Sequence, residues 1–144
     1  MASENKVYLQ HSFKCDQETL FDWLTKPELI GQWFGPEGFS TGNVQCELVE
    51  GGAYSIELIK VKVPRFTVQG EYIEIRRPIR LRFSYRYLGL ENPPPPSIVR
   101  FDLMRTTPDQ TELSMVQEFE IETPDFATRS KAWVFMFDKL EGLI

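Results

Sequence analysis

Several stretches of the chain alternate apolar with polar residues, which is the pattern of a β-strand that buries one face. Near the start, Val7, Leu9, His11 and Phe13 share one parity, which predicts a first strand with these four side chains turned inward. The clearest alternation covers residues 79–87, where apolar side chains take turns with arginines and a serine. It predicts an antiparallel strand with one face in the core and the other in water.

Further strand-like segments follow one another through the middle of the chain. Turn residues such as Gly51-Gly52 and Pro108-Asp109 separate them. The predicted strands there cover residues 44–49, 53–60, 66–75, 79–87, 97–106 and 111–122. Together with the strand over residues 7–13, they predict a six- to seven-stranded antiparallel sheet.

Three segments repeat their apolar residues at helical spacing instead. Asp16 is expected to cap a first short helix, and Pro27 to begin a second one that ends at Gly35. Residues 124–125 are expected to open the third, a helix over residues 126–144 with a length of roughly 28 Å, enough to cross a whole sheet. Its apolar face contains Phe126, Trp133, Phe137, Leu140 and Ile144.

Composition and charge narrow the class of protein. A chain of 144 residues with 42% hydrophobic and 13% aromatic residues suits one domain, residues 1–144, with one core. A net charge of −5 argues against nucleic acid as a partner, because binding phosphates needs a basic surface. We see no apolar segment of a signal peptide and no run of the roughly 20 apolar residues that span a membrane. Cys15 and Cys46 form no C-x-x-C pair, so reduced thiols in a cytoplasmic protein are expected.

The arginines of residues 79–87 form a basic stripe on the outer face of their strand. Arg80, Arg82 and Arg86 could contact an anionic partner, but a solvated face with ion pairs to a neighbouring strand is the plainer interpretation. The expected ion-pair partners are Glu112, Glu118 and Glu120 of the last strand.

Five segments carry motifs that are similar to those of one protein family. Residues 27–36 match P-E-x-x-x-x-W-F-G-P, residues 50–54 match x-G-G-x-Y/W, and residues 70–75 match G-x-Y/V-x-E-I. Residues 111–115 match T-x-L-x-x, and residues 133–140 occupy the closing helix. On these motifs the chain resembles the family related to the activator of heat-shock protein 90 ATPase, within the START-like (SRPBCC) superfamily.

The resemblance implies a helix-grip fold of the α+β class. In that fold a curved antiparallel sheet, two short helices and a long C-terminal helix enclose a cavity. Some members of the superfamily carry lipids, hormones or polyketides, and some act on them. The namesake activators have an additional N-terminal domain that contacts the chaperone. This chain has nothing before residue 6 to supply that domain, so we do not expect chaperone activation on the family name alone.

Inward aromatic residues are the first candidates for a cavity wall, because Tyr and Trp carry polar tips that prefer a partner when buried. The candidates are Trp33, Tyr54, Tyr85, Trp133 and Phe137. The plainer alternative is that they only fill a core. Gln117 interrupts the apolar parity of the last strand, and an unpaired buried amide costs about 1–3 kcal/mol. Gln117 is therefore expected to hydrogen-bond another residue, a water or a ligand, whereas Arg129 is expected on the outer face of the closing helix.

His11 is the single histidine and a candidate donor or base in the same cavity. The plainer alternative is a core or rim histidine satisfied by a neighbouring Tyr or backbone group, since the sequence offers no partner that would orient it. No G-x-S-x-G or similar signature supports a nucleophile. One histidine with two distant cysteines gives no metal-ligand spacing. We therefore predict no catalytic residue, no metal and no cofactor.

The leading hypothesis is a protein that binds a small hydrophobic or amphipathic ligand between the sheet and the C-terminal helix, without chemistry of its own. The first alternative is a protein-interaction module that contacts a chaperone or a second copy of the chain, as a homodimer. It would need an exposed apolar patch of more than a few hundred Å². The second alternative is an enzyme of the cyclase or hydrolase kind, which would need His11 beside an acid or water inside a cavity.

Overall fold

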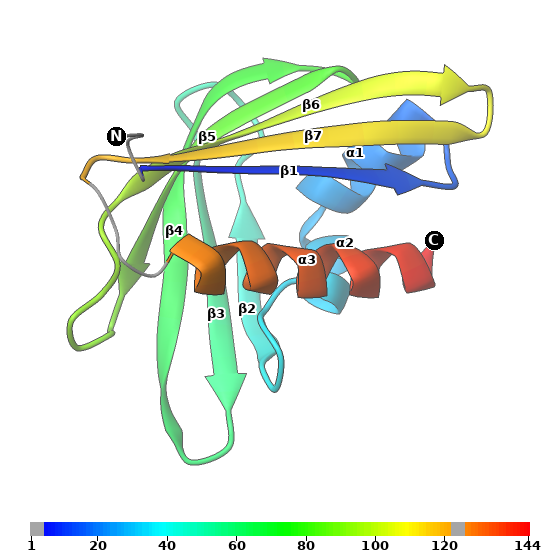
Figure 1. The fold of residues 1–144 in the computed structure, drawn as a ribbon. Helices are drawn as coiled ribbons and strands as arrows, with labels where there is room; N and C mark the ends of the chain where they lie inside the picture. The colour runs from blue at the N-terminus through cyan, green and yellow to red at the C-terminus, as the bar shows by residue number, and fades with distance from the viewer. Residues whose placement is uncertain (1–4, 122–125) are drawn as a thin grey trace.

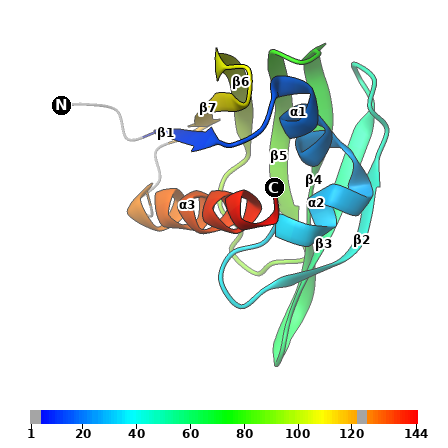
Figure 2. The same ribbon diagram turned by 90° about the vertical axis from the view of Figure 1, so that its right-hand side faces the viewer.

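The computed structural model describes residues 5–121 and 126–144. In this part of the chain one antiparallel sheet has the order β1-β7-β6-β5-β4-β3-β2, and the long helix α3 lies against its inner face (Figure 1). The short helices α1 and α2 lie near the C-terminal end of α3 (Figure 2). The elements are β1 (Lys6–Phe13), α1 (Gln17–Thr25), α2 (Pro27–Trp33), β2 (Ser40–Cys46), β3 (Ala53–Lys60), β4 (Val63–Arg76), β5 (Arg80–Leu88), β6 (Ser97–Thr107), β7 (Gln110–Phe119) and α3 (Phe126–Leu143). The predicted α+β helix-grip arrangement is confirmed.

Predicted and observed strands differ most at β2. The sequence predicts a strand at residues 44–49, whereas β2 covers Ser40–Cys46. A shift in the pairing with β3 just before Val44 hides the alternation at the start of this strand. After its end the chain turns, and the Gly52 N–H donates to the Val49 carbonyl (2.8 Å). The predicted end of the last strand at residue 122 and the predicted opening of the closing helix at residues 124–125 lie outside the described residues.

Both short helices begin as the sequence predicts. The Asp16 carboxylate accepts a hydrogen bond from the Thr19 backbone N–H (2.8 Å), which caps α1 and lowers the pKa of that carboxyl. Pro27 takes the first position of α2. This helix ends before Gly35, whose φ of +118° is a conformation that glycine adopts without strain. The Gly35 N–H then donates to Met136 Sδ (3.2 Å), which joins the end of α2 to α3.

The arginines of β5 lie on the outer face of the sheet, but their ion-pair partners differ from the prediction. Arg80 pairs with Asp102 on β6 (Nε to Oδ1, 2.7 Å), and Arg82 reaches Glu74 on β4 (Nη1 to Oε1, 3.6 Å). The prediction that these arginines pair with carboxylates of the last strand is wrong. The reason is topological, because β5 is flanked by β4 and β6 and lies two strands away from β7.

The hydrophobic core fills the space between α3 and the inner face of the sheet. Strand residues of the predicted inward parity supply much of it, and Val7, Phe13 and Leu113 are fully buried. In residues 5–121 and 126–144, no helix combines the length and the apolarity that crossing a bilayer requires.

Candidate functional site

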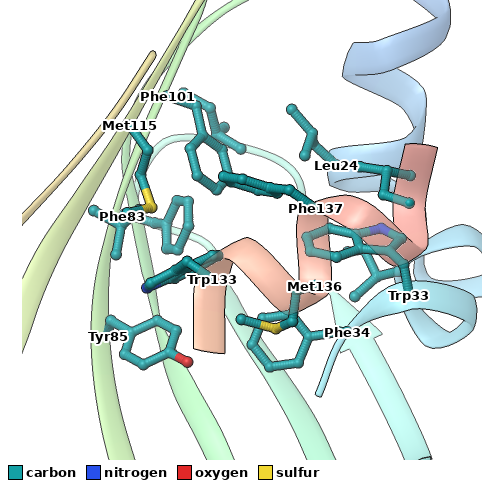
Figure 3. Packing of buried hydrophobic residues seen from close by; sticks show 14 of the residues in the cluster. Leu24, Trp33, Phe34, Phe83, Tyr85, Phe101, Met115, Trp133, Met136 and Phe137 are labelled. Atoms are coloured by element: carbon teal, nitrogen blue, oxygen red, sulfur yellow. The ribbon is translucent and has the colours of Figure 1, made fainter. Parts of the chain in front are cut away.

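Trp133 lies at the centre of an aromatic cluster between α3 and the sheet, and 3% of it is exposed. Its ring centroid is 5.9 Å from those of Tyr85 and Phe101, which project from the sheet. Phe34 and Phe137 flank the same ring at 6.3 and 5.6 Å. Figure 3 shows the Trp133 ring between the helix α3 and the aromatic rings that project from the strands of the sheet. The predicted burial of Trp133 is confirmed.

A short chain of hydrogen bonds connects this cluster to two strands. The indole Nε1–H of Trp133 donates to Gln117 Oε1 (2.9 Å), and Gln117 Nε2 donates to Ser97 Oγ (2.9 Å). Gln117 and Ser97 are both buried. The amide that interrupts the apolar parity of β7 is therefore satisfied by other residues of the chain, which was one of the expected possibilities.

A small cavity, here called the inner cavity, lies beside the aromatic cluster. Its volume is about 30 Å³, which is room for one water molecule and too little for an organic ligand. Trp33 and Tyr54 contribute to its wall, together with aliphatic residues such as Leu24 and Ile56. The space that the sequence predicts between sheet and helix is thus largely filled by side chains at this end.

A larger cavity, here called the α3 cleft, opens beside the first half of α3 and has a volume of about 180 Å³. Its apolar wall includes Phe34, Leu58, Phe66, Leu90, Trp133 and Met136. Its polar groups belong to Tyr85, Tyr87, Gln117 and Arg129. Phe34, Tyr85 and Trp133 line both cavities, so these three side chains form the partition between them.

The structure gathers most of the candidate site residues around this partition. Trp33 and Tyr54 line the inner cavity, Gln117 lines the α3 cleft, and Tyr85 and Trp133 line both. The remaining two candidates, Phe137 and His11, line neither of the two cavities. Phe137 packs within the aromatic cluster, with its centroid 6.2 Å from that of Phe101.

His11 lies on the edge strand β1, beside the C-terminal end of α3. Its Nε2 is 2.5 Å from Glu141 Oε1, and its ring centroid is 4.6 Å from that of Phe13. The inward parity predicted for His11 therefore brings it against the helix and away from the two cavities. Its partner is a surface carboxylate of α3 that the sequence pattern does not single out.

Two of the polar residues that line the α3 cleft, Tyr87 and Arg129, are not among the predicted site residues. Tyr87 shares the inward parity of Tyr85, which is a signal that the sequence does contain. Arg129 was expected on the outer face of the closing helix, and that prediction is wrong. Its guanidinium lies over the Phe119 ring, with Cζ 5.3 Å from the centroid. The reason is its spacing, because a residue four positions before Trp133 lies on the same face of a helix.

The hydroxyls at the α3 cleft are held in their neutral form. Burial raises the pKa of Tyr85 well above its usual value, and burial also raises that of Tyr87. Tyr85 donates a hydrogen bond to Tyr87, which raises the pKa of the first and lowers that of the second. The positive charge of Arg129 partly opposes the rise at both. Both phenols therefore act as hydrogen-bonding groups rather than as bases near neutral pH.

The side chains that line the α3 cleft are mostly apolar, with a few polar groups among them. Its wall, as far as the chain is described, contains no His, Cys, Asp or Glu side chain that could act as a nucleophile or a general base. Across residues 5–121 and 126–144, no three such side chains come together as a metal site. Apolar walls with a few polar groups are the usual composition of a small-molecule site.

Comparison with known proteins identifies relatives of the same fold. Protein CV1439 from Chromobacterium violaceum superposes with a TM-score of 0.88 at 22% identity, over 97% of this chain and 96% of that one. A protein from Arthrobacter aurescens gives a TM-score of 0.85 at 13% identity, over 97% and 86% of the two chains. The AHSA1 protein from Silicibacter pomeroyi gives 0.78 at 20% identity, over 96% of each chain. Among curated proteins no match is found.

The sequence itself also matches a family model. The model describes the Activator of Hsp90 ATPase homolog 1-like proteins and matches residues 14–144, which is most of the chain. The matched range includes both short helices, which precede Gly35, the six strands β2 to β7, and α3. The chain therefore belongs to the Activator of Hsp90 ATPase homolog 1-like family.

Proposed function

We propose that this protein binds a small amphipathic molecule in the α3 cleft and carries out no covalent chemistry on it. The observation that carries the proposal is the α3 cleft itself, about 180 Å³ of space with aromatic and aliphatic walls and a few polar groups. Burying apolar ligand surface against such walls contributes about 25 cal/mol per Å², and the polar groups fix the ligand's orientation.

The polar groups support an amphipathic rather than a purely apolar ligand. Gln117 already uses its oxygen and one amide hydrogen within the chain, but an amide has further hydrogen-bonding capacity. The hydroxyls of Tyr85 and Tyr87 also line the cleft. A ligand with an apolar body and one polar end would leave none of these groups facing a hydrocarbon surface.

The enzyme alternative receives no support from the geometry. His11, the residue on which it depends, contacts Glu141 and lines neither cavity. The interaction-module alternative would need a continuous apolar patch. The most exposed apolar side chains are instead distributed over separate elements, as Tyr8 on β1 and Leu88 on β5 illustrate.

A cleft-filling variant tests the proposal. Ala132 lines the α3 cleft from the helix side, so Ala132→Phe would occupy its space without removing the hydrogen bonds of Gln117. Val134→Phe, at an exposed position of the same helix, is the matched control. The parent and both variants would be titrated with medium-chain alcohols, acids and aryl alkanols, and thermal unfolding would be followed.

We expect the parent and the control to be stabilised by ligand, by about 2.7 kcal/mol at a hundredfold excess over Kd. Ala132→Phe should fold and show no ligand stabilisation. The proposal fails if no compound stabilises the parent, or if Ala132→Phe responds as the parent does. In the first case the interaction-module alternative would take its place.

A further inference from the structure

Arg129 is the one charged side chain among the described residues that line the α3 cleft. The remaining wall is aromatic, aliphatic or neutral and polar, and the chain as a whole carries a net charge of −5. A single cation beside a partly desolvated apolar space favours anionic ligands over neutral ones, because interactions between charges strengthen as water is excluded.

The position of the guanidinium is constrained by packing. Arg129 is half-buried on α3, and its Cζ lies 5.3 Å from the centroid of the Phe119 ring on β7. Stacking on an aromatic face fixes the plane of the guanidinium while leaving its N–H groups at the edge. Arg129 has further interactions in the protein. With five N–H donors, a guanidinium can serve more than one acceptor.

We infer that the α3 cleft selects ligands that carry a carboxylate on a short apolar or aryl chain. In this inference Arg129 is the residue that binds the carboxylate. The inference rests on the proposed function and names the class of ligand for the same site. The apolar body would lie against Phe34, Trp133 and Met136, and the carboxylate would accept hydrogen bonds from Arg129.

Two neighbouring hydroxyls fit the same arrangement. Tyr87 lines the cleft with Arg129, and because it accepts the hydrogen bond from Tyr85 it keeps its own hydrogen to donate to a carboxylate oxygen that Arg129 leaves open. The positive charge of Arg129 lowers the pKa of both phenols against the effect of burial, which means that its field favours negative charge at their oxygens. A ligand anion on this side of the cleft would be favoured by the same field.

The experiment compares acids with alcohols of the same skeleton. Octanoate is paired with 1-octanol, and 3-phenylpropionate with 3-phenyl-1-propanol. Their Kd values are measured by titration calorimetry at pH 7.5 in low and high salt. The variant Arg129→Met removes the charge and keeps an apolar side chain over Phe119. Arg105→Met is the matched control, because Arg105 is an exposed arginine on β6 that does not line the cleft.

We expect the parent and Arg105→Met to bind each acid about tenfold more tightly than its alcohol, as hydrogen bonds to a charged group provide. Arg129→Met should lose about tenfold in Kd for the acids and stay within about twofold for the alcohols. Added salt should weaken only the acids.

Equal affinity of the parent for acid and alcohol would overturn the inference and leave the proposed function standing. Retained acid preference in Arg129→Met would do the same. Failure of the parent to bind any of the four compounds would overturn both. If Arg129→Met does not fold, equal affinity of the parent for acid and alcohol still overturns the inference, and a preference for the acids that high salt does not weaken overturns the role of a charged residue.

Discussion

The Trp133 indole N–H and the Gln117 side-chain oxygen are 2.9 Å apart, and both side chains are buried. This contact joins the closing helix α3 to the strand β7. It also places both residues on the wall of the α3 cleft, so that the group that anchors the helix is part of the candidate binding surface. A substitution at either residue therefore changes both the packing of α3 and the wall of the α3 cleft.

Replacing Trp133 tests the anchoring role. Trp133→Ala should lower the free energy of unfolding by about 3–5 kcal/mol, because it removes the ring at the centre of the aromatic cluster and leaves a cavity. Val134→Ala, at an exposed position next to it, should cost under about 0.5 kcal/mol. Urea melts of both variants measure the difference. Equal midpoints would show that the helix does not bury this face.

Gln117 should be coupled to Trp133 energetically. Gln117→Leu leaves the Trp133 N–H and the Ser97 hydroxyl without their partner, and should cost about 1–3 kcal/mol. Trp133→Phe removes the same N–H. The double variant should therefore lose less than the sum of the single losses, with a coupling of about 1 kcal/mol. A double-mutant cycle from urea melts provides the number, and strictly additive losses would argue against the hydrogen bond.

The cap of α1 predicts a dependence of stability on pH. The pKa of Asp16 is lowered in the folded protein by its hydrogen bond to Thr19. Its contribution is therefore complete above the unfolded value of about 3.9 and is lost as the pH falls through the lower folded pKa. The parent should be more stable than Asp16→Ala near neutral pH, and the two urea midpoints should converge in acid. Asp16→Asn keeps a capping oxygen and should resemble the parent near neutral pH.

Cys15 should react slowly in the folded protein. Burial, and then the charge of Asp16, raise the pKa of the Cys15 thiol to about 11. The thiolate is the nucleophile, so at pH 8 its fraction is about 100-fold below that of a thiol with a pKa of 9. Alkylation by iodoacetamide, followed by peptide mass spectrometry, should be correspondingly slower in the native chain than in urea. Comparable rates in the two states would contradict the burial.

Parity and spacing along the chain predicted the sheet and its inward residues, because each strand's faces depend only on its own sequence. The order of the strands in the sheet could not be predicted in this way. His11 was correctly turned inward, but its contact with Glu141 depends on β1 occupying an edge of the sheet. The ion pairs of Arg80 were misassigned for the same reason, since its partner lies on whichever strand is adjacent.

The candidate site was less predictable than the fold. The contact of Ser97 with Gln117 requires the register of β6 against β7, which no local pattern encodes. The four-residue spacing between Arg129 and Trp133 does place both on the same face of α3. The prediction of the outer face for Arg129 relied instead on the usual preference of arginine for water. The cleft volume depends on how side chains from four strands, from α3 and from the connecting loops fill the space, and composition does not determine that.

The pairing of β1 with β7 has a consequence for how the chain folds. Strands β2 to β7 are consecutive neighbours in the sheet, so each can pair soon after it leaves the ribosome. β1, the first strand made, must wait for the last one, since Val7 lies opposite Gln117. Trp133 is synthesised later still, because it follows β7 in the sequence. Until then the aromatic face formed by strands β2 to β7 lacks the cover that α3 provides, and an exposed apolar face of this kind favours association between incompletely folded chains.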